Sequence, residues 1–127
     1  MDLTTEKEKT DLSTERIACA FSSHRFDVAL PYLADDVIWT VVGSDPLIGR
    51  KAVKKACERT AGGLAAVTTE FQRQRTVVGE DSVVVDSLAR YTGADGDVSV
   101  VASCDVFDFD EAGRITEIVS YTVELPT

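Results

Sequence analysis

The sequence predicts an α+β fold in which three N-terminal helices cover the concave face of a curved antiparallel sheet. Two patterns predict it: apolar residues recur at helical spacing in most of the N-terminal half, and they alternate with polar residues in the C-terminal half. The expected order is α-α-β-α-β-β-β-β, so helices and long strands are segregated along the chain. With 127 residues, of which 44% are hydrophobic, the chain is long enough for one domain with its own core.

Two helices are expected first. The segment 13–21 reads as a helix that Ser13 can cap, with Ile17 and Phe21 one turn apart on a common face. A second helical pattern begins at Phe26, and Pro31 interrupts it. Because proline removes a backbone donor and clashes with the preceding turn, this second helix should be short or kinked.

The remaining elements follow from turn residues. A β-type run over 37–42 ends in a turn, and a third helix over 49–57 is expected to stop at Gly62-Gly63. Beyond that point the sequence has no helical pattern, and tight turns connect successive strands into an antiparallel meander. The four expected strands cover residues 67–75, 82–92, 98–109 and 115–123.

Charge and composition argue against several classes of partner. Thirteen Lys and Arg against 22 Asp and Glu leave a net charge of −9, so a nucleic acid or an anionic membrane would be repelled. Residues 1–11 form a polar lead-in without the apolar segment of a signal peptide. Cys19, Cys57 and Cys104 are odd in number and far apart, which is typical of buried thiols in a reducing compartment. We therefore expect a cytoplasmic protein that binds neither nucleic acid nor membrane.

Four segments in order resemble one known family. They are the helix-to-strand junction YLADDVIW (32–39), the turn GSDPLIGRKAV (43–53), CDVFDF (104–109) and GRITE (113–117). Together they resemble the nuclear-transport-factor-2-like superfamily, in particular its SnoaL-like (polyketide-cyclase-like) and ketosteroid-isomerase-like branches. The resemblance covers residues 12–124 and implies a single cone-shaped domain over 12–127. It does not specify a reaction, because one fold can host many functions.

In this family a cavity lies between the sheet and the helices, and strand alternation indicates which side chains enter it. The expected cavity is mostly apolar, which suits a small hydrophobic or carbonyl-bearing molecule. The residues that the resemblance and the alternation place around this ligand are Ile17, Phe21, Trp39, Val41, Ser87, Ala89, Tyr91, Ser103, Phe107, Ile118 and Thr122.

Asp105 is the main catalytic candidate. A carboxyl group in the middle of an apolar strand needs a partner or becomes neutral, and a neutral carboxyl can donate a hydrogen bond. Asp105 resembles the protonated Asp in the oxyanion hole of ketosteroid isomerase, a member of this superfamily. The alternative is an Asp that is hydrogen-bonded to a neighbour without chemistry. Ser120 is the second candidate, because it stands where related cyclases carry an acid on the last strand.

The departures from these relatives limit the reaction. Ile17 stands where ketosteroid isomerases have a Tyr, and Thr40 or Val41 stands where their base would fall, so steroid isomerase activity itself is not expected. Epoxide hydrolases of this fold need an Arg and an Asp together on a central strand. Asp86 and Arg90 are of the right type, but the alternation places both on the outer face of the sheet.

Other site types find little support. His24, the single histidine, lies in a polar stretch where the family has an exposed turn between helices. One His with scattered Cys is a poor ligand set for zinc, and no glycine-rich phosphate loop is present, so no metal or other cofactor is expected.

Two hypotheses follow. The chain either binds a small molecule with isomerase-, cyclase- or hydratase-type proton chemistry at Asp105, or it is a non-catalytic ligand carrier or dimeric interaction module. Because relatives commonly dimerise through the sheet, a homodimer is expected. Its interface would contain the mixed outer-face residues Asp86, Leu88, Arg90, Val106, Val119 and Tyr121.

Overall fold

The structure, a computed structural model, describes residues 12–127, and the predicted lead-in over 1–11 lies outside this range. Helices α2, α3 and α4 span Thr14–Ser22, Phe26–Ala29 and Arg50–Leu64, and a 3₁₀ helix, η1, spans Leu30–Tyr32. The strands are β1 (Leu33–Val41), β2 (Leu47–Ile48), β3 (Thr68–Val78), β4 (Ser82–Thr92), β5 (Val98–Phe109) and β6 (Ile115–Leu125). The predicted order of the main elements is confirmed, with β2 as an additional two-residue strand.

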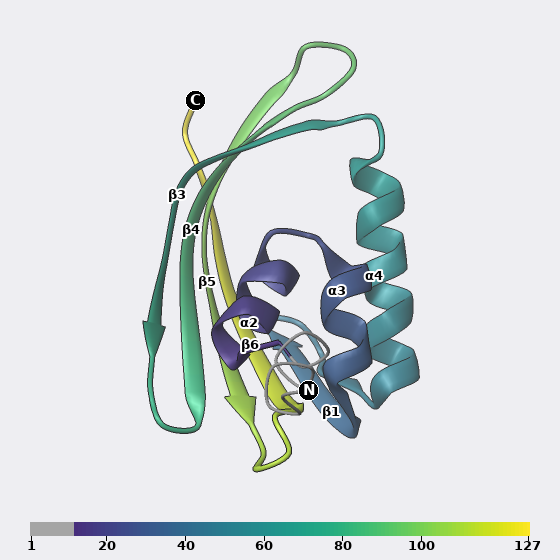
Figure 1. The fold of residues 1–127 in the computed structure, drawn as a ribbon. Helices are drawn as coiled ribbons and strands as arrows, with labels where there is room; N and C mark the ends of the chain where they lie inside the picture. Colours follow the sequence, from purple (N-terminus) through teal and green to yellow (C-terminus); the bar gives the residue numbers. More distant parts are fainter. Residues whose placement is uncertain (1–11) are drawn as a thin grey trace, which may run out of the picture.

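The strands form one curved sheet in the order β2-β1-β6-β5-β4-β3. Strands β3 to β6 are the expected antiparallel meander, whereas β1 runs parallel to β6, so the sheet is mixed rather than wholly antiparallel. This parallel pair is possible because α4 and β3 to β5 lie between β1 and β6 in the sequence and provide a long crossover. Figure 1 shows the helices together on one side of the curved sheet.

The core lies between the helices and the face of the sheet that they cover. Its centre is Phe21 on α2, which is 3% exposed and makes edge-to-face contacts with Phe26, Trp39 and Phe107 at centroid distances of 5.3, 5.1 and 5.6 Å. Such aromatic contacts add to the stabilisation from burial alone. Phe21 therefore links α2 to α3, to β1 and to β5.

Three predicted boundaries were wrong, including that of β3, which continues to Val78 instead of ending at residue 75. Helix α4 continues through Gly62-Gly63 to Leu64, because glycine weakens a helix without preventing it and these two residues lie in its last turn. Strand β1 begins at Leu33 rather than at residue 37. The exposed Asp35-Asp36 pair reads as a turn in the sequence, but it lies within β1, where the pairing with β6 shifts register between Leu33 and Ile38.

Strand β3 also departs from simple alternation. Its pairing with β4 shifts register between Phe71 and Arg73, which is typical of a β-bulge. Phe71 therefore lies on the helix-covered face, whereas Arg73 and Arg75 point to the other face and contact Asp86 on β4, with nitrogen–oxygen distances of 3.4 and 2.8 Å. The bulge places a ring at the cavity described below and two cations outside it.

Candidate functional site

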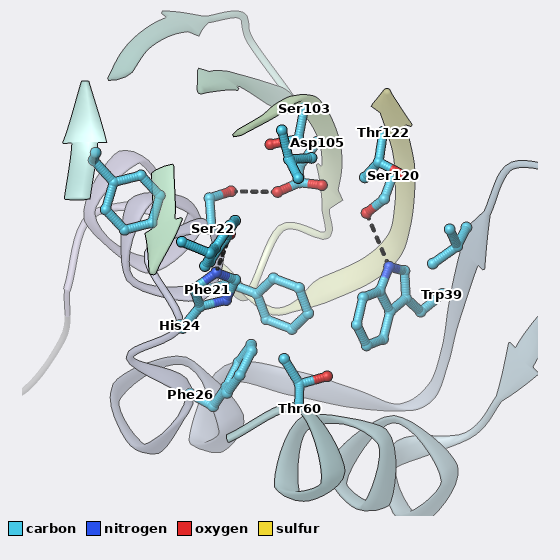
Figure 2. Close-up of a pocket in the computed structure, with 14 residues that line it drawn as sticks. Phe21, Ser22, His24, Phe26, Trp39, Thr60, Ser103, Asp105, Ser120 and Thr122 are labelled. Carbon is cyan, nitrogen blue, oxygen red and sulfur yellow. Dashed lines mark hydrogen bonds between the residues drawn. The ribbon is translucent and has the colours of Figure 1, made fainter. Parts of the chain in front are cut away.

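A cavity of about 250 Å³ lies between the sheet and the helices. Figure 2 shows its side chains converging from β5 and β6 on one side and from the helices on the other. It is lined by Phe21, Ser22, His24, Phe26, Trp39, Val41, Thr60, Phe71, Tyr91, Val101, Ser103, Asp105, Ser120 and Thr122. Several of these side chains are aromatic, and none is Lys or Arg, so the site suits an apolar ligand without a carboxylate.

Polar side chains of β5 and β6 form part of the cavity wall on the sheet side. Asp105 on β5 pairs directly with Ser120 on β6, and Ser103 pairs with Thr122 two residues away. Directly paired residues of antiparallel strands project to the same face with their Cβ atoms about 5 Å apart. The carboxyl group of Asp105 and the hydroxyl group of Ser120 are therefore neighbours on the cavity wall.

The hydroxyl group of Ser120 is oriented by the neighbouring strand. Trp39 Nε1 donates a hydrogen bond to Ser120 Oγ at 2.9 Å, and the parallel pairing of β1 with β6 brings the two side chains together. A serine hydroxyl that accepts one hydrogen bond still has its own proton to donate. Ser120 can therefore act as a donor to an acceptor atom in the cavity.

The last residue of helix α2 contacts the same sheet-side wall. Ser22 is 7% exposed, and its Oγ donates a hydrogen bond to Asp105 Oδ2 at 2.7 Å. Asp105 itself is half-buried. A hydrogen bond to a carboxylate is about twice as strong as one between neutral groups, so Ser22 fixes the orientation of the Asp105 carboxyl group.

His24 follows two residues later and takes an unusual backbone conformation. Its φ is +65°, and the bonds from His24 N–H to the Phe21 carbonyl (3.1 Å) and from Arg25 N–H to the Ala20 carbonyl (2.8 Å) form a Schellman cap. Glycine usually occupies this position, because the left-handed region costs other residues roughly 1 kcal/mol or more. The turn directs the imidazole into the cavity, where Nε2 lies 3.0 Å from Tyr91 Oη.

Burial shifts the protonation of both members of this pair. It lowers the pKa of His24, while the charge of Asp105 acts in the opposite direction. Burial, with a further contribution from the charge of Asp105, raises the pKa of Tyr91. At neutral pH the pair is therefore a neutral imidazole and a neutral phenol.

The predicted site residues divide into two groups. Eight of them line the cavity: Phe21, Trp39, Val41, Tyr91, Ser103, Asp105, Ser120 and Thr122. Five are buried without lining the cavity, each at most 3% exposed: Ile17, Ser87, Ala89, Phe107 and Ile118. Strand alternation predicts which face a side chain occupies, but not where along the strand the packing closes, and the role of all these residues in ligand binding stays a prediction.

Six lining residues were not predicted: Ser22, His24, Phe26, Thr60, Phe71 and Val101. The placement of His24 on an exposed turn was wrong, because its ring is half-buried and its Nδ1 atom is inaccessible to solvent. The sequence carried no periodic signal for this placement, because His24 lies beyond the last helical residue, in the turn that the Schellman cap forms.

Asp86 lies outside the cavity, as the alternation predicted. Hydrogen bonding by Arg75 is the main cause that lowers its pKa, and Arg73 acts in the same direction. Among residues 12–127, no group of three or more His, Cys, Asp and Glu side chains is arranged to hold a metal ion. No helix in the same range is both long and apolar enough to cross a membrane.

Comparison with known proteins places this geometry in a family. The model of the SnoaL-like domain matches residues 14–118, which is most of the chain. The chain belongs to the SnoaL-like family. Among curated proteins, none matches the sequence.

Solved structures agree with this assignment at the level of the fold. An NTF2-like protein of unknown function from Cytophaga hutchinsonii is 24% identical, with a TM-score of 0.74 over 85% of this chain and 94% of that one. An LEH-like epoxide hydrolase from M. tuberculosis is 22% identical, with a TM-score of 0.66 over 87% and 82%. SalBIII, an epoxide hydrolase/cyclase-like enzyme in pyran ring formation in the polyether salinomycin, is 20% identical, with a TM-score of 0.63 over 87% and 90%. The SnoaL-like chain thus has the NTF2-like α+β cone fold.

Proposed function

We propose that this SnoaL-like protein binds a small, mostly apolar molecule that carries a carbonyl or similar oxygen, and that Asp105 performs isomerase-, cyclase- or hydratase-type proton chemistry on it. The observation that carries the proposal is the half-buried carboxyl group of Asp105 on the wall of an aromatic cavity that no Lys or Arg of residues 12–127 lines. A ligand with a negative charge would be repelled there, and an apolar ligand would be held by the rings.

The surroundings of Asp105 suit proton transfer. Ser22 holds one carboxyl oxygen at 2.7 Å, and Ser120, its cross-strand neighbour, has a proton to donate. A positioned carboxyl group within hydrogen-bond reach of a ligand can give or take a proton, which typically accelerates a reaction about 10²- to 10⁴-fold. The similar epoxide hydrolase and SalBIII, described as epoxide hydrolase/cyclase-like, support chemistry of this general type in such a cone.

The test uses two neutral probes of nearly equal shape, 2-acetylnaphthalene and 2-ethylnaphthalene, whose affinities are measured by isothermal titration. The ketone should bind more tightly than the hydrocarbon. The proposal assigns the Asp105 carboxyl group the role of hydrogen-bond donor to the ketone oxygen, so Asp105→Leu, which is similar in size and cannot donate, should weaken ketone binding at least tenfold, which corresponds to about 1.4 kcal/mol. Asp108→Leu is the matched control, because Asp108 lies on the same strand outside the cavity, where it accepts a hydrogen bond from Ser82.

Two outcomes would count against the proposal. Equal affinities of the wild-type protein for the two probes would show that no polar group in the cavity recognises the oxygen. An unchanged ketone affinity in Asp105→Leu would remove Asp105 from the site. Tight binding of a natural ligand without turnover would favour the alternative, a non-catalytic carrier that needs only the cavity.

A second proposal concerns assembly. We propose that the outer sheet face, defined here by Val106, Val119, Tyr121 and Val123, binds a second copy of the chain. Tyr121 and Val123 are 50% and 60% exposed on this face, and no element of residues 12–127 covers it (Figure 1). Exposed apolar side chains that are neighbours on one face are typical of an interface. Val123→Lys should convert a dimer to a monomer in sedimentation experiments, and a wild-type monomer would contradict the proposal.

A further inference from the structure

His24 occupies a position that its backbone does not favour. It has a φ of +65° at the end of α2, where glycine would form the same Schellman cap without strain. Its side chain lies in the cavity rather than in solvent. When a residue at a candidate site is held in a sparsely populated backbone conformation, the strain suggests that its side chain has a function at that site.

The imidazole is held by contacts from three elements. Its ring lies 5.7 Å from the Phe26 ring on α3, 5.8 Å from the Phe71 ring on β3 and 6.1 Å from the Tyr91 ring on β4, measured between centroids. The polar contact within this group joins His24 Nε2 to Tyr91 Oη at 3.0 Å. The ring is therefore fixed in place and aligned on a single oxygen.

The other ring nitrogen indicates which tautomer is present. Nδ1 is buried and has no hydrogen-bond partner among residues 12–127. A proton on Nδ1 would leave a buried N–H unpaired, and unpaired buried donors are rarer in proteins than under-satisfied acceptors. With its proton on Nε2, the imidazole donates to Tyr91 Oη, and the phenol keeps its own proton for another acceptor.

We propose that His24 is a positioning residue that directs the hydroxyl proton of Tyr91 into the cavity, where Tyr91 donates a hydrogen bond to the oxygen of the ligand. This inference rests on the proposed function, because it needs a ligand with an acceptor oxygen near Asp105. It gives the cavity a second hydrogen-bonding group for the ligand, the Tyr91 hydroxyl on β4, in addition to the pair formed by Trp39 and Ser120. The direction of both pKa shifts supports it, since the imidazole stays neutral and the phenol keeps its proton.

The tautomer can be measured directly, because His24 is the only histidine in the chain. Long-range ¹H–¹⁵N NMR spectra of the full chain at neutral pH distinguish a protonated Nε2 from a protonated Nδ1. The proposal predicts protonation at Nε2 and a change of the Nε2 shift in Tyr91→Phe. Protonation at Nδ1 would overturn it, because Tyr91 would then donate its proton to His24 and not to a ligand.

Binding of the two naphthalene probes tests the consequence for the ligand. Tyr91→Phe should weaken binding of 2-acetylnaphthalene three- to tenfold and leave binding of 2-ethylnaphthalene unchanged. His24→Gly should have a similar selective effect, because glycine suits the left-handed turn and should preserve the fold. The double variant should bind the ketone no more weakly than Tyr91→Phe alone, since both substitutions remove one hydrogen bond.

The outcomes separate this inference from the proposed function. If Asp105→Leu weakens ketone binding but Tyr91→Phe and His24→Gly do not, the positioning role is wrong and the proposed function stands. If both probes lose affinity equally in His24→Gly, the role of the ring is only structural, and the inference is overturned. If the wild-type protein shows no preference for the ketone, both proposals fail.

Discussion

The two walls of the cavity are built by different rules. On the sheet side, Ser103, Asp105, Ser120 and Thr122 point inward because alternate residues of a strand share a face and paired residues are neighbours. On the helix side, Ser22 and His24 enter through the last turn of α2, where the chain leaves helical geometry. The residues of the sheet wall follow the two-residue period of a strand, which the sequence displays. The turn at the end of α2 follows no such period.

The polar contacts that join the walls come from this turn. Ser22 bonds to Asp105 on β5, and His24 bonds to Tyr91 on β4. Ser23 is connected to Gln74 on β3 by side-chain hydrogen bonds. Three successive positions therefore attach the end of α2 to three strands, and the sheet wall depends on this turn for the orientation of its polar groups.

The largest loss of stability is expected for a substitution of Phe21, whose ring contacts residues on both the helix side and the sheet side of the cavity. Phe21→Ala should lower the free energy of unfolding by about 3–5 kcal/mol, because it removes a buried ring and leaves a cavity. Urea unfolding monitored by circular dichroism measures this change. Phe71→Ala is the control. Since Phe71 is 36% exposed at the rim, its loss should cost clearly less, and equal losses would contradict the central position of Phe21.

A smaller loss of stability is expected when the hydrogen bond between Ser22, at the end of α2, and Asp105, on the sheet wall, is removed. Ser22→Ala should lower the free energy of unfolding by about 1–2 kcal/mol, because the carboxyl group of Asp105 loses a buried donor. The matched control is Ser23→Ala, whose hydrogen bonds to Gln74 are exposed. The same urea measurement would contradict the account if the two serines gave equal losses.

The smallest effect is a pH dependence from His24. Its pKa is lowered in the folded protein, so the unfolded chain takes up the proton more readily. The contribution of His24 to stability should be complete above its unfolded pKa of about 6.5 and should decrease as the pH falls through that value toward the folded pKa. The groups that face the ring are Asp105, whose charge opposes the shift, and the neutral phenol of Tyr91.

His24→Gly provides the control for this pH dependence. Between about pH 7 and pH 5 the wild-type protein should lose more stability than the variant, because the variant lacks the titrating group. Unfolding by urea at several pH values measures the difference. Parallel pH profiles for the two proteins would show that His24 does not titrate differently in the folded state.

Most of the fold could be predicted because it rests on periodic patterns. The β-type runs between turn residues over 82–92 and 98–109 correctly predicted β4 and β5, and the interruption at Pro31 correctly predicted that the second helix, α3, is short. The parallel pairing of β1 with β6 was missed, since it depends on where the chain returns after the meander. The bulge that turns Phe71 inward was also missed, because one extra residue in a strand leaves no mark in composition.

The candidate site was predictable only in part. The placement of Asp105 and Trp39 in the cavity followed from the resemblance to relatives. The extent of the cavity was misjudged because side-chain volumes, not strand faces, decide that Phe107 and Ile118 are enclosed in the core instead of lining it. His24 was misplaced because a polar sequence after a helix reads as exposed, whereas a Schellman cap can turn such a residue inward.

The most direct test of the account is a crystal structure of the protein with 2-acetylnaphthalene. We expect the naphthalene rings to lie among Phe21, Trp39 and Phe71, with the carbonyl oxygen about 3 Å from hydrogen-bonding atoms of Asp105 or Tyr91. A ketone bound with its oxygen toward solvent, or one bound only on the outer sheet face, would contradict the claim that Asp105 belongs to a ligand-binding site.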